Sequence, residues 1–230
     1  MQFSYSKIST YKQCPYKFKL LYIDKIGKPV VNEALIKGSK IHSLLENYEY
    51  VINQYTENPQ NAGNGKDVEY LNIVLTFSKS DIGHDILNKQ SIREHCVKFD
   101  ENLNANDSLS KKETYLIGYI DRINLSNEIE LIDYKTGKYK DPKFQDFEQL
   151  SIYGLYIFSK YPSINEIKLR YVYVEHCREN SKLITRADSA IIKQLLVNDL
   201  NEIKNAVQYP RKIQKLCDWC EFVNFCKSKK

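Results

Sequence analysis

The stretch IELIDYKTGK, residues 129–138, places an acidic and a basic side chain two positions apart within an otherwise apolar segment. Alternate side chains of a β-strand point to the same face, so Asp133 and Lys135 are expected to share one face of a strand. Their neighbours Leu131, Ile132 and Tyr134 are apolar and indicate that this strand is largely buried. The two charged groups are therefore expected to line a cleft in a sheet.

A second strand, TYLIGYIDRINL at residues 114–125, brings another carboxylate, Asp121. A three-residue turn at 126–128 would place Asp121 directly opposite Asp133 on the same face, about 5 Å away. Two carboxylates at that distance repel each other unless a cation lies between them. The alternative is that Asp133 and Lys135 form an exposed ion pair, which contributes under about 1 kcal/mol.

A pair of carboxylates in a cleft, with an ammonium group beside them, is suited to metal-assisted phosphodiester hydrolysis. A hard divalent cation such as Mg²⁺ is typically bound by one or two carboxylates and keeps open positions for substrate oxygens. Lys135 would then orient a metal-bound water or neutralise negative charge that develops on a phosphate. The residues of this hairpin therefore predict a metal site.

The composition indicates a globular protein that is mildly basic. The chain has 230 residues, a formal net charge of +5 and 42% hydrophobic residues, with a pI of about 8.7 and a mean hydropathy of −0.52. These values fit one domain and a phosphate-rich partner. Because no apolar run approaches the roughly 20 residues that span a bilayer, and the N-terminus lacks the apolar core of a signal peptide, we expect a cytoplasmic protein with no membrane partner.

Hydrophobic periodicity predicts helices on both sides of a group of strands. Strands are expected at residues 114–125, 129–138, 166–177 and 182–186. Helices are expected at residues 4–13, 16–24, 39–55, 187–207 and, after an opening turn, within 141–162, with one or two more in 67–104 and a loop at about 57–66. A mixed sheet flanked by helices buries these faces economically, so the expected fold class is mixed α/β. The expected parts of this single domain, 1–230, are a helical region at about 1–110, a core at about 111–206 and a Cys-rich tail at 207–230.

Three of the six cysteines cluster near the C-terminus with the spacing C-x2-C-x5-C. In a reducing cytoplasm, clustered cysteines are more often metal ligands than disulfides. A four-ligand site needs one more thiolate, for which Cys14, followed by Pro15, is the candidate. The alternative is a set of buried thiols that act as small apolar side chains, and this interpretation is preferred for Cys96 and Cys177. The predicted ligands are Cys14, Cys217, Cys220 and Cys226.

The segments GYIDRINL and IDYKTGK, in this order, resemble the PD-(D/E)XK nuclease superfamily. The resemblance is nearest to the RecB-like nucleases, including the CRISPR-associated RecB-like exonucleases and the AddB-type nucleases that carry an iron–sulfur cluster. GSKIHSLLE, residues 38–46, is similar to the family's helix with a metal-binding histidine, here His42. Asp121 matches the first acidic ligand. Asp133 and Lys135 match the acidic-x-Lys element, with Asp in place of the more familiar Glu.

Two further elements extend the resemblance along the chain. Gln149 and Tyr153, in QLSIY, resemble the family's Q-x3-Y element on the helix after the sheet. This implies that Gln149 lies near Lys135 and that Tyr153 donates to a DNA phosphate, with helix packing as the alternative. The cysteines at both ends of the chain resemble the family's four-Cys iron–sulfur arrangement. Residues 51–110 match no such element.

The resemblance implies a restriction-endonuclease-like core with a helical lobe and a metal cluster that staples the chain ends. It implies a metal-dependent DNA nuclease, foremost a single-strand DNA exonuclease, that acts in recombination, repair or CRISPR adaptation, with protein partners in a DNA-processing complex. The implied cofactors are Mg²⁺ or Mn²⁺ and a [4Fe–4S] cluster, with Zn²⁺ as the alternative at the cysteines. The alternatives are an endonuclease, the nuclease subunit of a helicase complex, or a non-catalytic DNA-binding module. The implied site residues are His42, Asp121 and Asp133 at the metal, with Lys135, Gln149 and Tyr153 beside them.

Two features near these residues have open interpretations. Glu46 lies one turn after His42 and is expected either to hold the imidazole ring or to be an ordinary surface residue. Basic residues flank the cysteines and form either a surface for the DNA backbone or a plain solvated face. These basic residues are Lys12, Lys17, Lys19, Arg211, Lys212 and Lys215.

Overall fold

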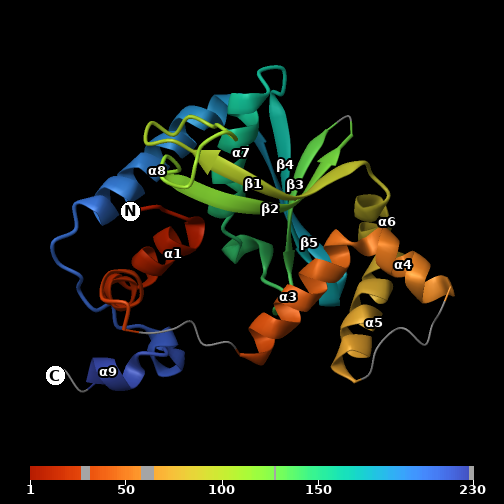
Figure 1. The fold of residues 1–230 in the computed structure, drawn as a ribbon, viewed down its shortest axis with the longest axis horizontal. Coiled ribbons are helices and arrows are strands. Elements are labelled where there is room, and N and C mark those ends of the chain that lie inside the picture. The colour runs from red at the N-terminus through yellow and green to blue at the C-terminus, as the bar shows by residue number, and fades with distance from the viewer. Residues whose placement is uncertain (27–31, 58–64, 127, 228–230) are drawn as a thin grey trace.

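The computed structural model describes residues 1–26, 32–57, 65–126 and 128–227, which form a five-stranded mixed sheet flanked by helices (Figure 1). The strand order follows the chain, and only β3 and β4 are parallel. Parallel neighbours need a crossover connection, which α7 supplies. This arrangement confirms the expected fold class. The strands are β1 (Ser91–Phe99), β2 (Leu116–Leu125), β3 (Ile129–Lys135), β4 (Glu166–Tyr173) and β5 (Arg178–Thr185).

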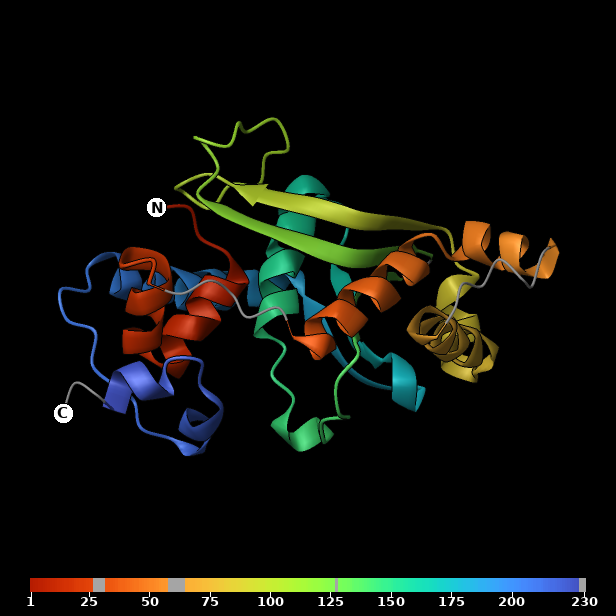
Figure 2. The ribbon, with the colours of Figure 1, turned by 60° about the horizontal axis from the view of Figure 1, so that its bottom comes forward.

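Helices cover both faces of the sheet (Figures 1 and 2). One face packs against α7 (Glu148–Lys160), with α1 (Tyr5–Gln13) and α8 (Ser189–Lys204) beyond it. The other face packs against α3 (Glu33–Glu46), α5 (Lys66–Lys79) and α6 (Asp81–Leu87). The remaining helical segments are α2 (Pro15–Phe18), the π-helix η1 (Lys19–Ile23), α4 (Tyr48–Glu57), η3 (Pro142–Phe144), η4 (Val174–His176), η5 (Arg186–Asp188), η6 (Lys215–Trp219) and α9 (Val223–Lys227).

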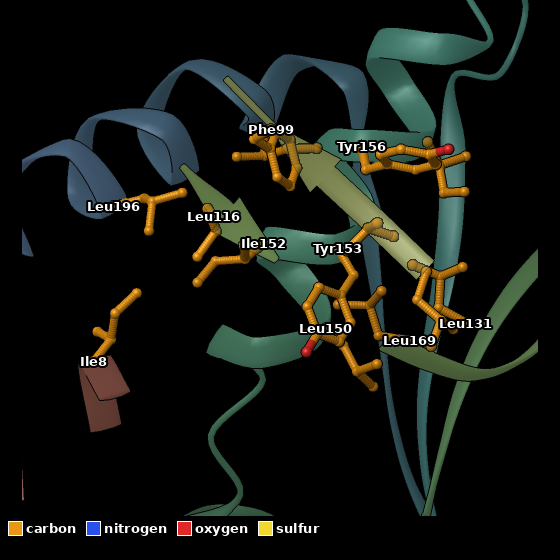
Figure 3. Close-up of a cluster of buried hydrophobic side chains, with 14 of the residues drawn as sticks. Ile8, Phe99, Leu116, Leu131, Leu150, Ile152, Tyr153, Tyr156, Leu169 and Leu196 are labelled. Carbon is orange, nitrogen blue, oxygen red and sulfur yellow. The ribbon is translucent and has the colours of Figure 1, made fainter. Parts of the chain in front are cut away.

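The main core lies between the sheet and α7 (Figure 3). Every residue of α7 from Leu150 to Phe158 is buried, as expected for a helix that is apolar on all sides. Leu131 of β3 and Leu169 of β4 contribute from the sheet, and Ile8 reaches this core from α1. The helix that carries Gln149 and Tyr153 is therefore fixed against the strands that carry the predicted acidic residues.

A buried charged network fixes the opposite face. Glu130 of β3 is only 3% exposed, and its carboxylate accepts hydrogen bonds from Asn124, Arg170 and Lys89 at 2.8–3.1 Å. Arg170 also contacts Asp85 of α6 at 2.8 Å. Buried charges are tolerated when they are paired in this way. The network ties α6 to β2, β3 and β4 behind the predicted site.

The two ends of the chain meet on one side of the molecule (Figure 2). Pro210 accepts a hydrogen bond from the amide of Tyr16 at 3.3 Å. The side chain of Gln214 donates to the carbonyl of Gln13 at 3.0 Å. We refer to residues 1–23 together with 207–227 as the terminal lobe.

The structure corrects the expectation that residues 67–104 are helical. The helices α5 and α6 occupy the first part, but Ser91–Phe99 form β1, so Cys96 lies in a strand and the sheet extends into the region expected to be helical. The helix with His42 begins at Glu33, ahead of Gly38. The strand expected to end at Cys177 ends at Tyr173. The loop expected at about 57–66 lies mostly outside the described residues.

The helices of the described residues contain none that is long and apolar enough to cross a membrane.

Candidate metal-binding site

The turn between β2 and β3 has the expected three residues. Leu125 pairs with Ile129, and the register continues to the pair of Arg122 with Ile132. Asp121 and Asp133 follow in the same register, just beyond the last paired residues. One oxygen of the Asp121 carboxylate accepts a hydrogen bond from the main-chain amide of Tyr134 at 2.7 Å. Where the two strands diverge, the Asp121 side chain thus takes the place of a main-chain hydrogen-bond acceptor.

The pairing of β1 with β2 is interrupted at the same point. Arg93 pairs with Arg122 and His95 with Ile120, but Glu94 and Asp121 between them are unpaired. Glu94 has a φ of 47°, in the left-handed region that residues other than glycine seldom occupy. The alternation of β2 also shifts by one residue here. Ile120 and Ile123 are three residues apart, yet both pack into the main core.

His42 reaches this break from α3. Ile41 and Leu45 anchor the helix by complete burial. Gly38 allows a close approach to the end of β3, because a Cβ atom at position 38 would lie 3.2 Å from Oγ1 of Thr136. The helix therefore passes directly over the ends of the strands, with His42 facing them.

The ring of His42 is held in a defined orientation. Nε2 lies 2.9 Å from the carbonyl oxygen of Tyr134, and Nδ1 lies 3.4 Å from a carboxylate oxygen of Asp121. A carbonyl only accepts hydrogen bonds, so Nε2 carries a proton. In the neutral ring, Nδ1 then presents a lone pair to the carboxylate. A proton or a metal cation between these atoms stabilises that arrangement.

Three side chains come together at the break in the sheet. His42, Glu94 and Asp121 each offer one ligand atom, and these atoms lie within 4.8 Å of one another. One imidazole nitrogen and two carboxylate oxygens form a ligand set that suits Mn²⁺ and is compatible with Mg²⁺. The sequence did not single out Glu94. The strand that carries Glu94 could have been recognised from the alternation of the apolar residues Val97 and Phe99. The change of face at Glu94 interrupts this alternation.

The charges of this group perturb one another. Burial lowers the pKa of His42, but the Asp121 and Asp133 carboxylates and the Tyr134 carbonyl outweigh that effect, so the pKa is raised. Burial and the Asp121 carboxylate raise the pKa of Glu94. The neighbouring carboxylates raise both pKa values, and a bound cation would neutralise that negative charge.

Asp133 and Lys135 form a close pair beside this group. The Lys135 ammonium lies 2.6 Å from Oδ2 of Asp133 and 4.7 Å from the ring centre of Tyr171. Asp133 is 6% exposed, and burial raises the pKa of its carboxyl. The ammonium group opposes the rise and Asp121 adds to it, which leaves the pKa at about 6. Burial and the nearby carboxylate thus disfavour the charged form of Asp133, and the Lys135 ammonium favours it.

Gln149 and Tyr153 face the sheet from α7. The Gln149 amide donates to the Tyr153 hydroxyl at 3.4 Å. The Tyr153 ring lies against Gly118 of β2, where a Cβ atom would come within 2.4 Å of the ring. Tyr153 is therefore closely packed beneath the strand that carries Asp121. This position agrees with a packing role, and the contact of Tyr153 with a phosphate stays a prediction.

Glu46 does not hold the His42 ring, which is oriented by the Tyr134 carbonyl. The main-chain carbonyl of Glu46 accepts a hydrogen bond from Arg93 of β1 at 2.7 Å. Its carboxylate is near enough to Glu94 to raise the pKa of that residue. Of the two interpretations of Glu46, the structure favours a surface carboxylate.

The four predicted cysteine ligands line a single cavity in the terminal lobe. Its volume is about 410 Å³, and it lies between the α1–α2 junction and the tail. No three cysteine sulfurs in the described part of the chain lie within 4.8 Å of one another. Four thiolates on one zinc ion, each at about 2.3 Å, would lie closer together than that. The cavity lining includes Cys14, Cys217, Cys220 and Cys226.

Comparison with known proteins identifies the class. The family model of the PD-(D/E)XK nuclease superfamily matches residues 2–227, so the chain belongs to this superfamily. No curated protein matches the chain. Among solved structures, the crystal structure of SSO0001 is similar, with 18% identity over 84% of this chain and 82% of the other. Its TM-score is 0.38.

Gly118→Ala tests the close packing of α7 beneath the site. A methyl group at this position displaces the Tyr153 ring, so we expect the free energy of unfolding to fall by about 1–3 kcal/mol in urea denaturation. Gly137→Ala is the matched control, since a Cβ atom there meets nothing within 4 Å, and its change should stay within about 0.5 kcal/mol. In a Tyr153→Leu background the cost of Gly118→Ala should shrink. An equal loss in both backgrounds would contradict the contact.

Proposed function

We propose that this PD-(D/E)XK nuclease is a metal-dependent deoxyribonuclease, acting as a single-strand exonuclease of the RecB-like type. The observation that carries the proposal is the convergence of His42, Glu94 and Asp121 next to the Asp133–Lys135 pair. The DNA substrate, the exonuclease activity and a role in recombination, repair or CRISPR adaptation rest on the sequence resemblance. So do protein partners in a DNA-processing complex, whereas the cytoplasmic location is the expectation drawn from the sequence itself.

The residues fit a divalent cation. The proposed ligands of Mg²⁺ or Mn²⁺ are His42, Glu94 and Asp121, whose ligand atoms lie within 4.8 Å of one another, together with Asp133, which lies beside this group. When bound, the cation supplies a Lewis acid for a phosphoryl oxygen. The main-chain groups of Tyr134 keep His42 and Asp121 aimed at this point.

Lys135 is the proposed group that acts on the attacking water. Its ammonium is held between the Asp133 carboxylate and the face of Tyr171. An ammonium has three donors, so others are free to orient a water or to neutralise charge on a phosphate. Gln149, at the start of α7, is proposed to assist in positioning that water. Tyr153 is proposed to support Gln149 through the hydroxyl contact and to approach the DNA phosphate.

We further propose that Cys14, Cys217, Cys220 and Cys226 hold a [4Fe–4S] cluster. Four thiols on one cavity are the ligand set that such a cluster needs. A cluster places iron and sulfide between its thiolates, so it accommodates sulfurs that are farther apart than those of a zinc site. Its role would be structural, since it joins two segments that are distant in sequence.

Substitution of the Asp133–Lys135 pair tests the nuclease. Asp133→Asn and Lys135→Ala should each lower DNA cleavage at least about 100-fold in Mg²⁺ or Mn²⁺, because each removes a group next to the reacting phosphate. Lys138→Ala is the matched control, since Lys138 is an exposed lysine three residues further along. The measurement is cleavage of end-labelled linear and of circular single-stranded and duplex DNA. Cleavage at the wild-type rate by Asp133→Asn would place the active site elsewhere.

The circular substrate distinguishes the two modes of cleavage. An exonuclease requires an end, so circular single strands should resist cleavage while linear strands are degraded. Cleavage of circles would favour an endonuclease, and cleavage that persists in excess chelator would contradict metal dependence.

Anaerobic purification tests the cluster. The protein should be brown, contain iron and acid-labile sulfide, and lose its colour in air. Cys14→Ser should bleach it and lower the Tm by at least about 5 °C, because the link between the chain ends is lost. Cys96→Ser, at a half-buried cysteine in β1, is the control and should keep the colour. Colourless protein with one zinc per chain would contradict the cluster.

A further inference from the structure

We propose that the terminal lobe carries a second nucleic-acid-binding surface, on which Trp219 stacks an unpaired base beside the apolar side chains of Ile213 and Leu216, while neighbouring basic side chains hold the phosphates. The inference rests on the proposed nuclease function and deepens it. It assigns single-stranded DNA as the ligand of a surface outside the metal site.

The tail presents an exposed apolar stripe. Ile213 is 90% exposed, Leu216 54% and Trp219 79%, and the three residues are spaced three apart. Leu216 and Trp219 lie on η6, a 3-10 helix, in which side chains three positions apart eclipse. They therefore share one face, which together with Ile213 borders the cavity that the four cysteines line and is open to solvent at its rim. Large apolar side chains grouped on a surface mark interaction sites.

Positive charge is concentrated in the same part of the chain. Residues 1–23 and 207–227 contain eight lysines and arginines against two acidic residues, a net charge of +6. Residues 24–206 contain 24 basic and 27 acidic residues, a net charge of −3. The chain ends meet in the terminal lobe, so this lobe generates a positive field on an otherwise slightly acidic protein.

The basic residues of the two chain ends are not equivalent. On α1, α2 and η1, three ammonium groups are paired with carboxylates, which reduces their value for a phosphate. Those pairs are Lys12 with Glu148 and Asp199, Lys17 with Glu221, and Lys19 with Asp24. On the tail, Lys212 and Lys215 are exposed and alternate with the apolar stripe, and Arg211 lies over the ring of Tyr16. Lys212 donates to the main-chain carbonyl of Lys12 at 3.1 Å, a contact that brings no counter-charge.

The combination of cations and exposed apolar faces fits a single strand better than a duplex or an apolar protein. Single strands offer both phosphates and free base faces, and base stacking on an aromatic side chain tolerates any sequence. A duplex hides its base faces. An apolar protein partner would have to desolvate the ammonium groups of Lys212 and Lys215 without a counter-charge, which is unfavourable.

Oligonucleotide binding by the anaerobically purified full chain in an Asp133→Asn background tests the surface without cleavage. Fluorescence anisotropy would compare a labelled oligothymidylate with a duplex of the same length. Trp219→Ala should weaken oligothymidylate binding about tenfold and duplex binding less than about twofold, and Trp219→Phe should retain most of the affinity. Tyr50→Ala is the matched control, because Tyr50 is another largely exposed aromatic residue, at 68%, on α4.

Salt dependence tests the cationic part of the surface. Lys215→Ala should weaken binding of both ligands and reduce the salt slope for the single strand by about 0.7, as expected for one lost phosphate contact. An unchanged slope would overturn the role of Lys215.

Two results would overturn the stacking surface. One is an unchanged oligothymidylate affinity in Trp219→Ala, which would leave the apolar stripe to another partner, such as a protein. The other is an equal loss of both ligands with a lower Tm or a loss of the brown colour, which would make Trp219 a structural residue of the cysteine cavity. The outcome is separable from that of the nuclease. If the wild type binds DNA through Trp219 but cleaves none, only the nuclease proposal is contradicted. If cleavage depends on Asp133 but binding does not depend on Trp219, only the surface proposal is contradicted.

Discussion

The main-chain groups of Tyr134 constrain the rest of the site. Its amide binds the Asp121 carboxylate at 2.7 Å, and its carbonyl lies 2.9 Å from Nε2 of His42. One residue of β3 therefore fixes an acid from β2 and an imidazole from α3. The Tyr134 side chain is 4% exposed and packs edge-on against Phe77 of α5 on the opposite face. Because that face is a packed core, this strand cannot shift without disturbing α5, and the orientation of both site residues is set by the fold.

The site lies where the regular strand pairing of the sheet is interrupted. Glu94 adopts a left-handed conformation and Asp121 bonds to an amide that a regular ladder would pair with main chain. Unusual backbone conformations of this kind persist only when the surrounding structure enforces them, and they cluster at functional sites. The same break gathers Glu94, Asp121 and Asp133, whose mutual repulsion a divalent cation would offset. Geometry and electrostatics thus favour one ligand class, and the superfamily match agrees with it.

The sequence predicted the parts of the site that follow from local patterns. The three-residue turn and period-two alternation predicted the register that brings Asp121 and Asp133 together, and the structure has that register. The family resemblance supplied His42, since no local pattern links a helix to a strand 92 residues away. Glu94 was missed because the change of face within β1 breaks the alternation by which a strand is recognised. The second face of the sheet, with its buried Glu130–Arg170 pair, depends on tertiary contacts that no single segment encodes.

Mn²⁺ binding tests the metal site most directly, because it needs no substrate and Mn²⁺ is visible by electron paramagnetic resonance. The wild type should bind Mn²⁺ at the His42, Glu94 and Asp121 group. Glu94→Gln should weaken that binding at least about tenfold. Loss of a residue that only orients a metal ligand already costs about this much, and Glu94 is proposed to bind the metal directly. Glu46→Gln removes an exposed carboxylate one turn from His42 and should change the affinity less than about twofold. Equal Mn²⁺ affinity in the wild type and Glu94→Gln would contradict a metal site at the break in the sheet.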